Sequence, residues 1–170
     1  EGWLAHVPGL KIAIPSTPED AAGLMWTAIH GDAPAFVLIP KHIFRKRVDV
    51  KSVEPVPFGK ARIVQQGSDV TLVSWGNTLE IADEAAKKLA SECSVEIIDL
   101  RTIVPCDFQA VAASLEKTGR LVVVQEDTKT CGFGQAVISE MTGNPAWFNY
   151  FLASPQLVSR GDVHIGFNPI

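Results

Sequence analysis

The stretch that most constrains the fold runs from Ser94 to Asp107, where an apolar segment passes into a polar turn. Its near-continuous, largely β-branched apolar run is typical of a strand buried on both faces of a parallel sheet. The apolar residues are Val95, Ile97, Ile98 and Leu100. Asp99 and Arg101 follow at the carboxyl end, where α/β sheets place their functional groups. Both side chains need polar partners if they are buried there.

The segments after residue 70 alternate between strand and helix patterns. Residues 70–75 and 121–124 predict further buried strands, and residues 157–159 can supply a last one. Helical periodicity follows at 78–89 and 132–141. A third helix is expected between Asp107, which can cap it, and Gly119, which ends it. This order predicts an α/β fold, a three-layer α/β/α domain with a mostly parallel sheet.

An antiparallel strand is expected at the edge of this sheet. Residues 59–65 alternate in polarity, and only a short turn separates them from the strand at 70–75. A short connection favours an antiparallel pair. The sheet is therefore predicted to be mixed at that edge.

The first residues predict a separate strand-helix-strand unit. The strands are 10–14 and 35–39, and the helix between them starts after a Ser16 or Thr17 cap and ends near Gly31. One helix cannot cover both faces of a parallel pair, so we expect the rest of this sheet upstream or on another chain. We expect these residues to be mobile, self-associated or packed against another copy.

A proline-containing, charged stretch without periodicity separates the two units. We predict a first unit over residues 1–45, a linker over 46–55 and the α/β/α domain over 56–170.

Composition excludes several function classes. The net charge of −4 and the pI near 5.5 give no basic footprint for nucleic acid. No apolar run reaches the ~18 residues of a membrane span. The three cysteines are far apart, which indicates neither a disulfide framework nor a zinc site, and favours a compartment with reduced thiols.

Two motifs could carry chemistry. Trp75-Gly-Asn77 lies where a strand hands over to a helix, which is typical either of anion binding or of a tight turn. Glu126 and Asp127 precede a glycine-rich helix start and suit acid-base or metal chemistry, or capping and interface roles. As neighbours on an extended chain they point to opposite sides. The four scattered histidines form no recognisable catalytic set. An anion-binding or assembly module is therefore one hypothesis.

A series of motifs in a fixed order resembles a known family. They are Trp3-x-x-His6-x-Pro8-Gly9-Leu10-Lys11, Pro57-x-Gly59-Lys60-Ala61, Gly67 to Val73, Ile98-Asp-Leu-Arg-Thr102, Lys117 to Thr128 and Gly132 to Ala136. Nearly the whole chain resembles part of the beta subunit, or of the beta half of a fused chain, of thiamine-diphosphate-dependent 2-oxo acid dehydrogenases of the pyruvate or branched-chain type. The resemblance implies the end of a pyrimidine-binding domain, followed by a transketolase C-terminal domain. Transketolase and deoxyxylulose phosphate synthase share this architecture and are the alternative.

The resemblance also implies what the parent protein does. It implies oxidative decarboxylation of a 2-oxo acid and acyl transfer to the lipoyl group of a dihydrolipoyl acyltransferase, in the cytoplasm or the mitochondrial matrix. Thiamine diphosphate and magnesium would be held upstream and by an alpha subunit. We therefore expect no catalytic or cofactor-binding residue in this chain, and no activity from it alone. Pairing with the alpha subunit, self-association and docking to the acyltransferase core are the expected contacts.

Three smaller expectations follow from the same resemblance. Ala28 and Ile29 match positions whose backbone carbonyls hold a monovalent cation in relatives, although Gly31 replaces the usual acidic residue. Gln125 stands where many relatives have histidine. The ending from Val163 to Pro169 replaces a more proline-rich one.

An aromatic group near the end of the chain suits either an interface or the core, because one small sheet does not readily hide so much apolar surface. It consists of Trp147, Phe148, Tyr150, Phe151 and the neighbouring Leu152.

Overall fold

The computed structural model describes residues 1–49 and 52–164, so most of the ending from Val163 to Pro169 lies outside the described residues. The strands are β1 Lys11–Ala13, β2 Ala35–Val37, β3 Arg62–Gln65, β4 Val70–Ser74, β5 Val95–Asp99, β6 Thr102–Val104, β7 Leu121–Thr128 and β8 Gln156–Arg160. The helices are α1 Gly2–Ala5, α2 Pro18–Ile29, the 3₁₀ helix η1 Lys41–Arg45, α3 Thr78–Lys88, α4 Phe108–Thr118, α5 Phe133–Gly143 and α6 Pro145–Phe148. None of the described helices is long and apolar enough to cross a membrane.

The larger sheet has five strands in the order β3-β5-β4-β7-β8. β4, β5, β7 and β8 run parallel, and β3 is antiparallel to β5, which confirms the predicted mixed edge. However, β3 does not pair with β4, which follows it in the chain. The loop between them crosses the amino end of β5, where the Asp69 amide donates to the Ser94 carbonyl at 2.8 Å. Only glycine fits at Gly67, because a Cβ there would lie 2.2 Å from the Glu96 nitrogen.

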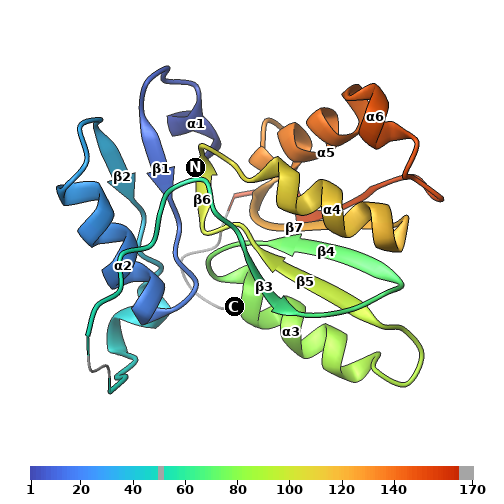
Figure 1. The fold of residues 1–170 in the computed structure, drawn as a ribbon, viewed down its shortest axis with the longest axis horizontal. Helices are drawn as coiled ribbons and strands as arrows, with labels where there is room; N and C mark the ends of the chain where they lie inside the picture. The colour runs from blue at the N-terminus through green and yellow to red at the C-terminus, as the bar shows by residue number, and fades with distance from the viewer. Residues whose placement is uncertain (50–51, 165–170) are drawn as a thin grey trace.

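Helices cover both faces of this sheet, as the predicted three-layer fold requires (Figure 1). Alternate residues along one strand contribute to different cores. Leu72 and Ile97 pack with α3 residues such as Leu79. Their neighbours Val73 and Ile98 pack with side chains of α4 and α5 on the other face. β5 is buried along its whole length, as predicted, although β4 rather than β5 is the middle strand.

The first unit forms the predicted parallel pair, β1 and β2, with α2 between them in the chain. Thr17 rather than Ser16 caps α2, accepting from the Asp20 amide at 3.2 Å. The same chain supplies one further strand, because residues 102–104, expected to be part of a polar turn, form β6 and pair antiparallel with β1. Ile12 is consequently buried in one core with Ile98. The unit therefore packs against its own chain, and the expected contact with another copy stays a prediction. The remainder of this sheet, expected upstream or on another chain, stays a prediction.

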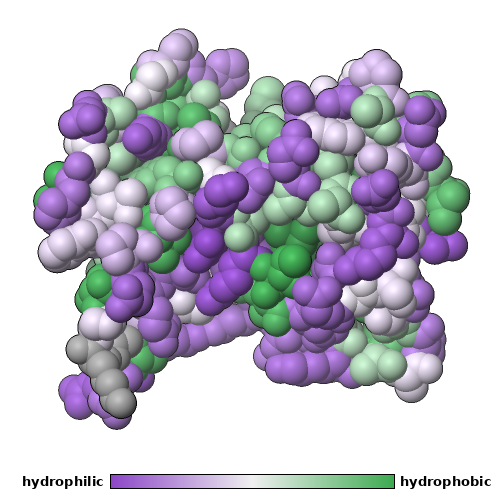
Figure 2. Space-filling view, viewed as in Figure 1, coloured by the Kyte–Doolittle hydropathy of each residue, from purple (hydrophilic) through white to green (hydrophobic). Residues whose placement is uncertain are grey.

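One exposed apolar patch lies on β3. Figure 2 shows it in the middle of the face that Figure 1 presents, flanked by hydrophilic surface. Ile63 and Val64 are 49% and 40% exposed although they are neighbours on a strand. The register of β3 on β5 shifts between Ile63 and Gln65, and this irregularity interrupts the usual alternation of side chains and leaves both apolar residues exposed.

Candidate functional site

The polar residues at the end of β5, Asp99 and Arg101, have partners from two other segments, residues 16–20 and 60–62. Asp99 is fully buried, and it accepts from the Ser16 hydroxyl at 3.1 Å and from the Arg62 guanidinium at 3.0 Å. The Arg101 amide donates to the same carboxylate at 3.1 Å. Burial raises the pKa of Asp99 to about 6, although the charge of Arg62 opposes the shift.

Arg101 connects this carboxylate to the first unit. Its backbone is left-handed, with φ 58°, and its guanidinium lies 3.0 Å from the Asp20 carboxylate of α2. The same guanidinium donates to the Lys60 carbonyl at 2.8 Å. Arg62 also reaches Asp20, at 3.1 Å. Asp20, Arg62, Asp99 and Arg101 therefore form a paired charge network that joins the two units, which confirms that Asp99 and Arg101 are satisfied by partners.

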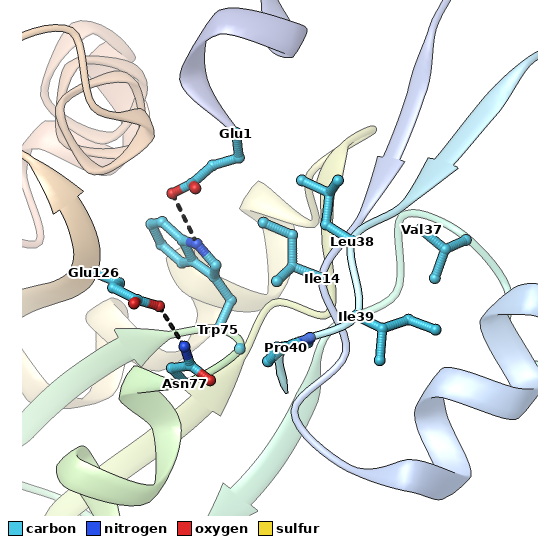
Figure 3. Close-up of a pocket in the computed structure, with 10 residues that line it drawn as sticks. Glu1, Ile14, Val37, Leu38, Ile39, Pro40, Trp75, Asn77 and Glu126 are labelled. Carbon is cyan, nitrogen blue, oxygen red and sulfur yellow. Dashed lines mark hydrogen bonds between the residues drawn. The ribbon is translucent and has the colours of Figure 1, made fainter. Parts of the chain in front are cut away.

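A cavity of about 390 Å³ lies beside this junction, and we call it the switch-point cavity. Its lining residues are Glu1, Ile14, Val37, Leu38, Ile39, Pro40, Trp75, Gly76, Asn77 and Glu126 (Figure 3). Apart from Glu1, which precedes α1, they lie at or near the carboxyl ends of β1, β2, β4 and β7. The chain passes from β4 to β5 on one side and returns to β7 on the other, so strand order reverses at β4. Open α/β sheets bind ligands at such a point.

Carboxylates dominate the polar side of the cavity. The half-buried Glu1 carboxylate accepts from the Trp75 indole nitrogen at 3.2 Å, and the Asn77 amide donates to Glu126 at 2.6 Å. Burial raises the pKa of Glu1, and the negative charges of Asp127 and Glu126 add to the shift. Glu126 lines the cavity, whereas Asp127 does not but lies with its carboxylate 3.9 Å from the Glu1 backbone nitrogen. Two carboxylates make this place unsuitable for an anion.

Gly76 has the role of a close-packed turn. Its φ of 58° lies in the left-handed region, and a Cβ there would approach the Ile14 side chain to 2.8 Å. The turn therefore brings the end of β4 against the first unit. The tight-turn interpretation of Trp75-Gly-Asn77 agrees with this geometry, and the anion interpretation does not.

The glycine-rich segment before α5 closes around a buried glutamine. Gln125 accepts from the Gly134 amide at 2.7 Å and donates to the Thr128 carbonyl at 2.6 Å. A Cβ at Gly132 would lie 2.0 Å from the Gln125 amide nitrogen. The glycines thus make room for Gln125, which caps α5. Sequence reasoning noted Gln125 as a departure from relatives but missed this role.

The other predicted residues lie apart from the cavity. Ala28 and Ile29 end α2, and the Ala28 carbonyl accepts from the Gly31 amide at 3.3 Å. The monovalent-cation site there stays a prediction. None of the four histidines lines the cavity. Within residues 1–49 and 52–164, no three His, Cys, Asp or Glu side chains are grouped to hold a metal ion.

Sequence comparison places this fold in a family. The sequence model described as "Transketolase, C-terminal domain" matches residues 59–165. The chain belongs to the transketolase C-terminal domain family.

The similar curated proteins are more specific. One is named pyruvate dehydrogenase E1 component subunit beta of Rickettsia felis, 39% identical over 165 residues, which are 96% of this chain and 50% of that protein. Proteins of the same name from Acholeplasma laidlawii and Staphylococcus aureus (strain Mu50) are 42% and 41% identical, over 88% and 84% of this chain and 46% and 45% of their own lengths. The chain therefore spans about half the length of these relatives. They confirm the predicted resemblance to 2-oxo acid dehydrogenase beta subunits.

A solved structure confirms the fold. It is titled "Split gene transketolase, inactive beta4 tetramer" and has a TM-score of 0.78, covering 95% of this chain and 52% of that one. Its sequence identity is 24%, so the likeness shows the fold alone.

Proposed function

We propose that this chain is part of the beta subunit of a thiamine-diphosphate-dependent 2-oxo acid dehydrogenase, and that the whole enzyme acts on pyruvate. The observation that carries the proposal is the 39–42% identity to pyruvate dehydrogenase beta subunits along most of the chain. The enzyme would decarboxylate its substrate oxidatively and transfer the acyl group to a lipoyl group.

In this proposal the chain supports catalysis without taking part in the chemistry. Magnesium requires oxygen ligands arranged with a phosphate, and the described residues offer no group of three or more His, Cys, Asp or Glu side chains that could hold it. The proposal therefore assigns thiamine diphosphate and magnesium to residues outside this chain and to an alpha subunit. The charge network supports a role in holding the first unit in place against the α/β/α domain.

Subunit pairing and partner docking are the proposed roles of the surface. The open strand β3 supports this, because exposed neighbouring apolar residues on an edge strand are otherwise an association hazard. A second exposed apolar patch, near α6, also supports these roles: Phe148 and Leu152 there are 57% and 74% exposed. We propose that these patches contact the alpha subunit, a second beta subunit or the acyltransferase core.

The activity is tested on the full-length protein with its alpha partner, thiamine diphosphate and magnesium. The expected result is pyruvate-dependent reduction of an artificial electron acceptor, with slower reduction when a branched-chain 2-oxo acid replaces pyruvate. Ketol transfer between sugar phosphates, without any 2-oxo-acid-dependent reduction, would overturn the proposal in favour of transketolase.

A further inference from the structure

The switch-point cavity has two unlike sides. One side is aliphatic and consists of Ile14 and residues 37–40. The other side carries the Trp75 indole with the carboxylates of Glu1 and Glu126 near it (Figure 3). A group that fills this space must therefore match an aliphatic surface and a negatively charged one.

The acceptors of the charged side are only partly used. Glu1 uses its Oε1 and Glu126 its Oε2 in the hydrogen bonds described, which leaves the other oxygen of each for a donor. The buried Oδ1 of Asn77 also has no hydrogen-bond partner among the described residues. No Lys, Arg or His side chain is part of the lining. The lining of the cavity thus presents acceptors and negative charge without a cationic side chain.

We propose that the switch-point cavity binds a primary ammonium group carried on a short aliphatic chain. An ammonium has three donors and no acceptor, which suits the oxygens of Glu1, Glu126 and Asn77. Its carbon chain would lie along Ile14 and Leu38, and indole rings attract cations. The volume of about 390 Å³ is within the range of small-ligand sites.

Two sources share this chemistry, a free alkylamine and a lysine side chain of another polypeptide segment. The site is a property of this chain and does not depend on which reaction the whole enzyme catalyses. Its test therefore uses binding and cross-linking, so its failure is distinct from a failure of the proposed activity.

The first measurement is calorimetric titration of the full-length protein with n-butylammonium chloride. We expect saturable binding to the wild type and an affinity at least tenfold weaker in Glu126→Gln. Glu126 is exposed, so this substitution leaves the fold intact, and Glu1→Gln tests the site from its other carboxylate. The matched control is Glu92→Gln, an exposed glutamate before β5 at the opposite edge of the sheet, and it should bind as the wild type does. The neutral analogue 1-butanol should not bind.

The second measurement identifies a lysine side chain as the source. If such a side chain already fills the cavity, the wild type gives no heat with butylammonium. A carbodiimide should then couple Glu126 to that lysine, which peptide mapping by mass spectrometry would identify, and Glu126→Gln should lose the cross-link. Three results would overturn the proposal: neither binding nor cross-link, equal binding of 1-butanol, or unchanged binding in Glu126→Gln.

Discussion

Asp99 has the most perturbed carboxyl environment in the charge network. It is fully buried, and burial raises its pKa from 3.8 to about 6. A carboxyl whose pKa is higher in the folded state binds its proton more tightly there. Its contribution to stability is therefore present below about pH 4 and is lost as the pH rises through about 6.

A pH series tests this sign. Between about pH 4 and pH 7 the wild type should lose up to about 3 kcal/mol of unfolding free energy relative to Asp99→Asn, because one pKa unit corresponds to about 1.4 kcal/mol. Urea unfolding of both proteins across this range provides the measurement. Parallel pH profiles would show that Asp99 does not titrate as its environment implies.

Substitutions at two glycines with left-handed backbones distinguish the cost of backbone strain from the cost of lost packing. Gly9 has φ 83° and open space around it, whereas a Cβ at Gly76 would meet Ile14 at 2.8 Å. Gly9→Ala should cost about 1 kcal/mol for the backbone alone. Gly76→Ala should cost about 1–2 kcal/mol more, because it also forces the two units apart. Equal losses in thermal or urea unfolding would mean that the Gly76 turn is not packed against the first unit.

At the scale of single elements, the strands and helices after residue 70 could be predicted from periodicity and caps. Asp107 caps α4 through the Ala110 amide at 3.2 Å, and Gly119 ends it with φ 68°. β6 could not be predicted, because its three residues are too few for a periodic pattern and its partner β1 is 89 or more residues earlier in the chain. The packing of the first unit depends on the same long-range pairing, so it could not be predicted from the sequence either.

Only some of the residues that line the switch-point cavity could be predicted from the sequence. The sequence predicts the strand-to-helix turn at Gly76 and indicates Glu126, because both follow segments with a clear strand pattern. The sequence gives no sign that the other lining residues lie beside Gly76 and Glu126, because only the pairing of β1 with β6 brings the first unit to the end of β4. These residues are Glu1, Ile14 and residues 37–40. Periodicity carries no information about contacts of that kind.

The charge network should control the attachment of the first unit. Arg101→Gln leaves Asp20 with one fewer cation and should cost about 3 kcal/mol of unfolding free energy. Amide exchange in β1 should rise more than in β4, since β1 depends on the junction. The matched control, Arg120→Gln, removes an exposed arginine and should change stability by less than about 0.5 kcal/mol. Equal exchange changes in β1 and β4 would assign Arg101 a global rather than a junction role.

At the scale of the whole molecule, the aromatic group near the end of the chain divides between core and surface. Trp147, Tyr150 and Phe151 pack against the main core, whereas Phe148 and Leu152 are largely exposed. The core interpretation is therefore confirmed for the first three residues, and the interface interpretation stays a prediction for Phe148 and Leu152.

This division predicts different outcomes for two variants, a double substitution on the surface and a single one in the core. Phe148→Ser with Leu152→Ser should weaken assembly of the full enzyme, measured by sedimentation velocity, with less than about 1 kcal/mol lost from the stability of the beta subunit. Trp147→Ser should instead destabilise the fold by about 3 kcal/mol, because it removes a core side chain. Normal assembly of the double variant would place the interfaces elsewhere, with β3 the next candidate.

The central claim is that this chain supports a thiamine-diphosphate enzyme without holding the cofactor. Calorimetric titration with thiamine diphosphate and magnesium tests it directly, on the 170-residue chain and on the full-length protein with its alpha partner. We predict saturable binding to the complete enzyme and no measurable heat from the chain alone. Saturable binding by the chain alone near micromolar Kd, about 8 kcal/mol on the affinity scale, would contradict the account.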